Sequence, residues 1–351
     1  MTPINNRKAD HINISLNQRI APGYCYWDDV RLVHNALPEV DADEIDTSIT
    51  LFGKKLDFPL IVTAITGGFN GAKKINANIA EACAELGIGM GVGSERAGVG
   101  GVEPESYSVV KDYDVPLMIG NIGAPQLIPQ HSRDIFTSDG IGRAKDLIDA
   151  DVVAIHLNYL QEAIQPEGDT NAKGCYDAIR DLTSLYPVIV KETGGGISRD
   201  VAARLKGTGI RGIDVAGMGG TSFAGVELHR AIAAGDDVRT GMGETFFDWG
   251  IPSPVSLVEA RCGLPLIASG GILDGIHVAC GIAMGASCAG VANAVLREAT
   301  ESAEAVKEKL TLIREELRAA MLLTGCSDIK RLSKARYVVL GETRQWLEGL
   351  E

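Results

Sequence analysis

Short apolar runs recur along the chain from Pro59 onward, and stretches with helical spacing of apolar residues separate them. Runs of about four to eight apolar residues are typical of strands buried on both faces of a parallel sheet. We predict strands at Leu60–Ala64, Ile88–Val92, Pro116–Gly120, Val152–Leu157, Val188–Lys191, Gly212–Val215, Leu266–Ser269 and Cys288–Val291. We predict helices at Ala72–Leu86, Ile141–Ala150, Ala172–Leu185, Arg199–Lys206, Val255–Arg261 and Asp274–Met284. This alternation predicts an α/β protein built on an eightfold β/α (TIM) barrel.

The fourth of these strands leads into the most polar segment of the pattern. Side chains alternate along a strand, so Ala154, His156 and Asn158 share one side of this run. The polar groups that follow are His156, Asn158, Gln161, Glu162, Gln165, Glu167 and Asp169. Imidazole, amide and acid groups at the end of an apolar strand favour an active site, although a strand that enters a solvated loop has the same pattern.

Three segments lie outside the repeating pattern. Residues 1–58 precede it, and we expect a hairpin within residues 45–58. A long final helix is expected at Arg297–Leu323, followed by a tail to the C-terminus. The glycine-rich connection Gly217–Gly250 is long enough to be a lid or a binding loop. We therefore divide the chain into an N-terminal extension (1–58), a barrel (59–323) and a tail that packs on the barrel (324–351).

Polar and glycine clusters follow each predicted strand, and active sites of barrel enzymes are built at that end. The clusters comprise residues 63–68, 93–96, Asn121, 156–162, Lys191, 217–222, 269–271 and 292–293. Gly270-Gly271 and Ala292-Asn293 follow strands seven and eight, where barrels commonly bind phosphate. Lys191 either extends to water or places positive charge beside a reduced flavin. Glu162, near Glu167 and Asp169, suits an oxygen-coordinated Mg²⁺.

One glycine motif is misleading. Residues 207–212 fit G-x-G-x-x-G, but they precede a predicted strand and therefore form a helix-to-strand turn, not a dinucleotide site.

Composition narrows the class of protein. The 42 glycines among 351 residues suit many tight strand-end loops. The net charge of −13 argues against nucleic-acid binding and against an anionic membrane surface, so an anionic substrate would need a local basic pocket. The seven cysteines form no C-x-x-C pair, and neither a signal peptide nor a membrane span is evident. We expect a cytoplasmic protein with reduced thiols.

The assembled motifs closely resemble the type 2, flavin-dependent isopentenyl-diphosphate isomerases. The resemblance runs from Arg7 to the C-terminal tail. It rests on RKADHI (7–12), TAITGG (63–68), GSERAG (93–98), NIGAPQL (121–127), HLNYLQEAIQPEGD (156–169), KETGGGIS (191–198), DVAGMGGTSF (214–223), FFDWGIP (246–252), IASGGI (267–272) and LTGCSDIKRL (323–332).

The resemblance implies interconversion of isopentenyl and dimethylallyl diphosphate in isoprenoid biosynthesis. It implies reduced FMN as acid and base, Mg²⁺, NADPH as the flavin reductant, and a homo-oligomer of four or eight chains. The implied FMN-binding residues are Ala64, Ile65, Thr66, Ser94, Asn121, Lys191, Thr221, Gly271, Ala292 and Asn293. The implied substrate-binding residues are Arg7, Lys8, Ser94, Arg96 and Gln161. Glu162 would bind the metal, and the implied catalytic residues are Gln161, His156 and Asn158.

The resemblance changes the interpretation of the N-terminus, and the sequence differs from the family's usual residues at a few positions. Charge alone favours a solvated basic segment at Arg7-Lys8, whereas the resemblance makes these residues the basic patch for the diphosphate. Tyr159, Met218 and Leu273 replace the family's usual Pro, Arg and Arg, and Phe223 replaces Trp. The change at 273 weakens any side-chain contact to the FMN phosphate there.

Two other functions fit part of the pattern. A 2-hydroxy-acid oxidase would need a His base and an Arg after a late strand, but the seventh predicted strand ends in Ser269-Gly270-Gly271. A non-catalytic flavin-binding protein would not need the metal and diphosphate residues.

Overall fold

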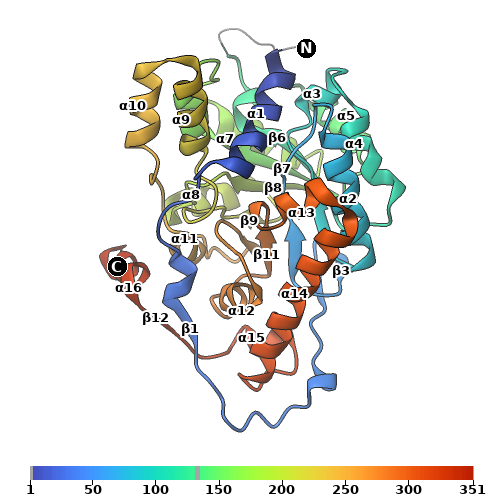
Figure 1. Ribbon diagram of the computed structural model, residues 1–351, viewed down its shortest axis with the longest axis vertical. Coiled ribbons are helices and arrows are strands. Elements are labelled where there is room, and N and C mark those ends of the chain that lie inside the picture. Colours follow the sequence, from blue (N-terminus) through green and yellow to red (C-terminus); the bar gives the residue numbers. More distant parts are fainter. Residues whose placement is uncertain (1–2, 131–134, 351) are drawn as a thin grey trace.

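The fold is a closed barrel of eight parallel strands, as predicted (Figure 1). The computed structural model describes residues 3–130 and 135–350. The barrel strands, in order around the barrel, are β4 (Leu60–Val62), β5 (Gly89–Gly91), β6 (Met118–Gly123), β7 (Val152–Leu157), β8 (Val188–Glu192), β9 (Ile213–Asp214), β10 (Leu266–Ala268) and β11 (Cys288–Val291), and β11 pairs with β4. Each strand overlaps its predicted range.

Alternation along the strands separates an inner core from an outer core. In β7, Val152 and Ala154 belong to the inner cluster, whereas Val153 and Ile155 belong to the outer cluster. The inner cluster also contains Leu51 and Leu56 of the hairpin β2 (Ile49–Leu51) and β3 (Lys54–Leu56). The predicted hairpin therefore plugs the barrel at the amino ends of its strands, which leaves the carboxyl ends for the site.

Helices surround the barrel and bury their apolar stripes against the outer core (Figure 1). They are α2 (Ala72–Glu85), α3 (Arg96–Val99), α4 (Glu105–Ser108), α5 (Ser138–Leu147), α6 (Tyr159–Ile164), α7 (Cys175–Thr183), α8 (Arg199–Lys206), α11 (Ser253–Glu259) and α12 (Gly275–Ala283). Short 3₁₀ helices are η1 (Tyr26–Asp29), η2 (Ala42–Glu44), η3 (Val109–Asp112), η4 (Ala124–Leu127) and η5 (Asn293–Val295). The turn at 207–212 joins α8 to β9, as expected.

Two expectations about helices were wrong. The connection 217–250 is not an open loop, because α9 (Phe223–Ala234) and α10 (Asp237–Thr245) fill most of it. Ser222 and Asp236 cap these helices by accepting hydrogen bonds from Gly225 N and Arg239 N. The final helix is also two helices, α13 (Leu296–Glu301) and α14 (Ala303–Leu322).

A serine explains the break in the final helix. Ser302 is extended, with φ −159° and ψ 165°, and its side chain accepts a hydrogen bond from Ala305 N. Local capping therefore overrides the continuous helical pattern at this point.

The two ends of the chain pack against different elements around the barrel. An N-terminal helix that the sequence pattern had not indicated, α1 (Pro3–Asn17), lies at the same end of the molecule as α9 and α10 (Figure 1). After α15 (Ile329–Leu332), β12 (Tyr337–Val339) pairs antiparallel with β1 (Val30–Leu32), and α16 (Gly341–Leu350) follows. Thr343 N donates to Asp29 Oδ2 at 2.9 Å and fixes α16 against η1. None of the described helices combines the length and apolar character needed to cross a membrane.

Candidate active site

A cavity of about 440 Å³ opens at the carboxyl ends of the barrel strands. This volume lies within the range of about 300–1,000 Å³ that is typical of small-molecule and cofactor sites. All the site residues indicated by the sequence line this cavity. They are Arg7, Lys8, Ala64, Ile65, Thr66, Ser94, Arg96, Asn121, His156, Asn158, Gln161, Glu162, Lys191, Thr221, Gly271, Ala292 and Asn293. Asn121 lies inside β6 rather than after it, since that strand extends beyond its predicted end.

Helix α1 forms part of the cavity lining with a single face. Arg7, Lys8, His11, Ile12 and Ser15 all line the cavity, and their spacing of three and four residues places them on one side of a helix. The polar N-terminal segment is thus a cover over the site rather than a solvated tail.

Lys8 reaches from this face to the loop after β5. Its Nζ donates to Ser94 O at 2.8 Å and to Tyr107 Oη, and Tyr107 Oη donates to Ser94 O at 2.7 Å. Burial, together with the charges of Arg7 and Arg96, lowers the pKa of Lys8 to about 7. We call Arg7, Lys8 and Arg96 the cationic wall; mutual repulsion among these groups would be relieved by a bound anion.

Glu162 on α6 is surrounded by hydrogen-bond donors. Its Oε1 accepts from Asn158 Nδ2 at 2.8 Å, and its Oε2 accepts from Asp169 N at 2.7 Å and from Gln165 Nε2. Gly168 permits this return of the chain, because a Cβ there would lie 1.7 Å from Glu162 O.

Two buried amide oxygens beside this carboxylate have no hydrogen-bond partner: Asn158 Oδ1 and Gln165 Oε1. Buried acceptors without partners are rare, and together with the Glu162 carboxylate they form a set of oxygen donors. Mg²⁺ prefers such donors and keeps several waters, so the residues fit that ion.

His156 at the end of β7 is neutral. Its Nδ1 lies 2.8 Å from Asn121 Oδ1. Burial, followed by the charges of Lys191, Lys8 and Arg96, lowers the pKa of His156 to about 3. Because an amide oxygen can only accept, Nδ1 carries the proton and Nε2 is left as an acceptor.

Gln161 is held by a residue that sequence reasoning missed. Its Nε2 donates to Glu227 Oε1 at 3.1 Å, and His11 Nε2 lies 3.0 Å from the same oxygen. Arg230 pairs with the other oxygen of Glu227. Burial alone would raise the pKa of Glu227, but the His11 hydrogen bond and the charges of His11 and Arg230 outweigh it and lower the pKa to about 2. Glu227 is on α9, in the region expected to be a loop, so no local signal linked it to Gln161.

Another part of the cavity lining is made of backbone. The segments Gly217–Gly220 and Gly270–Gly271, which we call the glycine wall, pack so closely that a Cβ on Gly271 would lie 2.7 Å from Gly219 O. Gly271 also has φ +81°, a conformation that favours glycine. Trp27 Nε1 donates to Gly270 O at 2.9 Å and supports this wall from behind. Backbone exposed after strands seven and eight suits a phosphate ester.

Lys191 is a further cationic side chain of the cavity lining. It is 12% exposed, its Nζ donates to Glu192 O at 2.7 Å, and it lies 4.0 Å from Asp214 Oδ2. Burial raises the pKa of Asp214, and Ser269 Oγ donates to its Oδ1. The ammonium group is therefore retained at the floor of the cavity and does not extend to bulk water.

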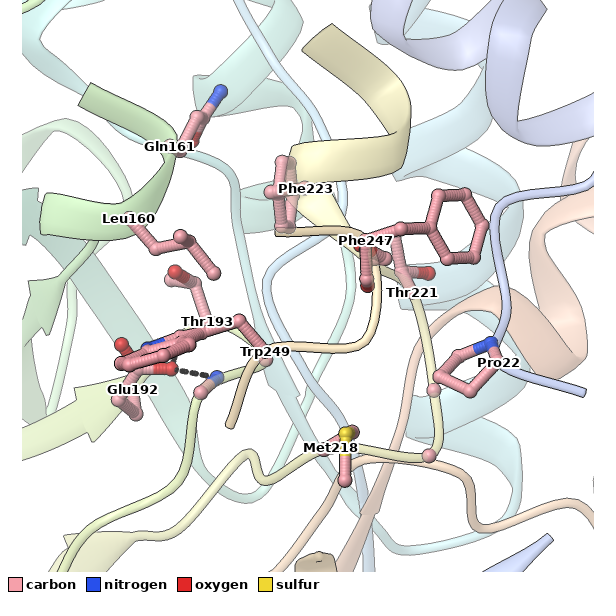
Figure 2. A pocket seen from close by; sticks show the side chains of 15 residues that line it. Pro22, Leu160, Gln161, Glu192, Thr193, Met218, Thr221, Phe223, Phe247 and Trp249 are labelled. Atoms are coloured by element: carbon pink, nitrogen blue, oxygen red, sulfur yellow. Dashed lines mark hydrogen bonds between the residues drawn. The ribbon is translucent and has the colours of Figure 1, made fainter. Parts of the chain in front are cut away.

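A second, much smaller pocket of about 10 Å³ adjoins the cavity and can hold about one water. Figure 2 shows its lining, in which Glu192 accepts hydrogen bonds from the backbone. Its size makes it an annex of the main cavity rather than a separate ligand site.

Comparisons with known proteins agree with this architecture. The model of the family described as FMN-dependent dehydrogenase matches residues 21–98 and 143–339. An isopentenyl-diphosphate delta-isomerase of Thermoplasma acidophilum is 45% identical over 99% of both chains. One of Archaeoglobus fulgidus is 46% identical over 97% of this chain and 98% of the relative. Among solved structures, a mandelate oxidase variant has a TM-score of 0.64 at 17% identity, covering 96% of this chain and 99% of the other. That identity is too low to show more than the fold.

Proposed function

Because the chain belongs to the FMN-dependent dehydrogenase family and, within it, to the isopentenyl-diphosphate delta-isomerases, we propose that it interconverts isopentenyl and dimethylallyl diphosphate. The observation that carries this proposal is the single cavity that joins the cationic wall to Gln161 and His156. A diphosphate needs the positive charges of the cationic wall. Proton transfer on an unactivated alkene needs positioned polar groups, such as Gln161 and His156, in a site closed to water.

The diphosphate would be bound by Arg7, Lys8 and Arg96. Mg²⁺ on Glu162, with the oxygens of Asn158 and Gln165, would share the phosphate oxygens. Because α1 brings Arg7 and Lys8, binding of the diphosphate would hold this helix over the cavity and exclude water from the alkene. This supports a role for the N-terminal extension in the substrate site.

The glycine wall, the loop after β4 and Lys191 would hold FMN. Backbone at Gly271 suits the phosphate, and the ammonium of Lys191 would stabilise negative charge on the reduced ring. When bound and reduced, FMN would supply the acid and the base of the 1,3-proton shift. We propose NADPH as its reductant, with no net redox change in the reaction.

The chain's own residues would direct the proton transfers. Protonation of the double bond develops tertiary-cation character, so the groups that face the alkene must not compete for the proton. The Nε2 of His156 is a weak base, because burial and the nearby cations lower the pKa of this residue to about 3, and Glu227 keeps the Gln161 amide in one orientation. Both observations support catalytic roles for His156 and Gln161, with Asn158 ordering Glu162 beside them.

Anaerobic incubation with FMN, Mg²⁺, NADPH and isopentenyl diphosphate in deuterated water tests the function. We expect dimethylallyl diphosphate that carries deuterium, with NADPH consumed only to prime the flavin. Consumption of NADPH one-for-one with a reduced product would instead establish an oxidoreductase. Bound FMN without any turnover would establish a flavin-binding protein.

Two further properties rest on the family resemblance. We propose a cytoplasmic location and an assembly of four or eight chains. Light scattering on the purified chain measures the mass of the assembly, and a monomer or dimer would contradict this assignment.

A further inference from the structure

A cysteine, an aspartate and a histidine meet outside the groups used above. The Sγ of Cys25, a carboxylate oxygen of Asp28 and a ring nitrogen of His277 all lie within 4.8 Å of one another. His277 Nε2 is 3.1 Å from Asp28 Oδ1. Among the residues the structure describes, this is the one such group of His, Cys, Asp or Glu ligand atoms.

Hydrogen bonds and packing elsewhere in η1 and α12 position these three side chains, in addition to the contacts they make with one another. Cys25 and Asp28 flank Trp27, whose side chain is 1% exposed and whose Nε1 is bound to Gly270 O. His277 lies in the first turn of α12, where Asp274 caps the helix by accepting from His277 N at 2.8 Å. The η1 segment and α12 are thus both anchored beside the glycine wall.

The three donors match a transition metal and not Mg²⁺. Thiolate, imidazole and carboxylate are the ligands of zinc-type ions, whereas Mg²⁺ takes oxygen donors such as those around Glu162. Metal–ligand bonds of about 2.0–2.3 Å in a tetrahedron place the donors roughly 3.3–3.8 Å apart. The 3.1 Å contact between His277 Nε2 and Asp28 Oδ1 is slightly shorter than this spacing, so the Asp28 side chain, which is 63% exposed, would turn by a few tenths of an ångström to admit the ion.

We propose that Cys25, Asp28 and His277 form a second metal site that binds Zn²⁺ or a similar ion, with water as the fourth ligand. On binding, the thiol of Cys25 releases its proton to solvent and Sγ bonds to the metal. The proton of His277 moves from Nε2 to Nδ1, which frees Nε2 for the metal.

The surroundings of the histidine suit this change. Nδ1 is 3.8 Å from Asp274 Oδ1, so a small rotation of this side chain would bring its carboxylate within hydrogen-bond distance of the new N–H group. Metal-binding histidines usually donate their second N–H to such a group. Leu273 N, which now donates to Nδ1 at 3.3 Å, gives up a long hydrogen bond.

The position of the site gives it a consequence for the cavity. Cys25 lines the main cavity, as do Gly271 and Leu273 next to the histidine. A bound ion would join η1 to α12, two segments whose ligands Asp28 and His277 are 249 residues apart. It would therefore fix the cavity wall beside Gly271. It would also raise the free energy of unfolding, because the ion binds the folded chain and not the unfolded chain.

The full-length, FMN-loaded chain, treated with a chelator and then kept in excess Mg²⁺, tests the proposal. Titration with Zn²⁺ by calorimetry should show one tight equivalent per chain. X-ray absorption at the zinc edge should show one sulfur at about 2.3 Å and nitrogen or oxygen neighbours at about 2.0–2.1 Å. These measurements do not depend on enzyme activity, so their result tests the metal site separately from the proposed isomerase function.

Variants identify the ligands. Cys25→Ser should remove the sulfur signal and weaken binding roughly 100-fold, and His277→Gln should weaken binding to a similar extent. Cys262→Ser, at another half-buried cysteine, should leave binding and the sulfur signal unchanged. Zinc without a sulfur neighbour, or binding that Cys25→Ser does not affect, would overturn the proposal.

Discussion

The two walls of the cavity use different parts of the chain for the same proposed task, which is to hold phosphate groups. The cationic wall uses side chains from α1 and α3, which are far apart in sequence. The glycine wall uses backbone from two tightly packed segments. Side chains on a helix that covers the cavity can follow a substrate in and out, whereas packed backbone cannot move without disturbing the barrel.

Because of this difference, we propose different ligands for the two walls. The wall built on the barrel itself suits a cofactor that stays bound through many turnovers. The wall that includes α1 suits a substrate that exchanges in every cycle. Changes on one wall should therefore leave the ligand of the other wall in place.

The sharpest test lies between the walls, at Gln161. Gln161→Ala removes the amide that Glu227 orients, and we expect turnover to fall roughly 10²–10⁴-fold. FMN should remain bound, because Gln161 is not part of the glycine wall. Deuterium incorporation measures turnover, and flavin absorbance after gel filtration measures retention. Gln345→Ala, at an exposed position on α16, is the matched control; full activity in Gln161→Ala would refute the role.

Glu162→Gln should act on the metal. Loss of the carboxylate charge should raise the Mg²⁺ concentration for half-maximal activity roughly 10–100-fold, with unchanged FMN content. Glu167→Gln is the matched control, since Glu167 pairs with Arg230 and Arg7 instead. Equal Mg²⁺ dependence in the two variants would show that Glu162 does not bind the ion.

Gly271→Ala should disturb the packing of the glycine wall and leave the cationic wall unchanged. Its Cβ would meet Gly219 O at 2.7 Å, so the two segments must separate, and we expect FMN affinity to fall roughly tenfold or more. Gly53→Ala tests the conformational cost by itself, because Gly53 has a similar φ of +83° with open space around it. Fluorescence titration with FMN compares them. An equal loss of affinity in both variants would exclude the clash as the cause.

The smallest expected effect concerns the charge state of Lys8. With a pKa of about 7, Lys8 is protonated below pH 7 and loses its charge as the pH rises through that value. Since the charged form would bind the proposed diphosphate more tightly, kcat/KM should fall above pH 7, at most about tenfold per pH unit. Lys8→Arg keeps its charge and should remove this decline. A decline that persists unchanged in Lys8→Arg would assign it to another group.

The local pattern of apolar and polar residues was sufficient to predict features that depend on a single strand. Every barrel strand was found because buried parallel strands are continuous apolar runs. The strand-end residues of the cavity could be named because barrel topology brings all the carboxyl ends of the strands to one edge, whereas Arg7 and Lys8 were indicated by the family resemblance alone. The helices α13 and α14 were predicted as one because Ser302 interrupts the pattern with a single cap that periodicity does not detect.

Contacts between segments far apart in the sequence could not be predicted from the local pattern of apolar and polar residues. The sequence by itself determined the barrel strands, the hairpin and the polar and glycine clusters at the ends of the strands. Only the tertiary structure decided that α1 closes the cavity, that Glu227 orients Gln161, and that Cys25 and Asp28 meet His277. The physical reason is that strand identity follows from the burial of neighbouring residues, whereas these pairings depend on how separate helices pack on the finished barrel.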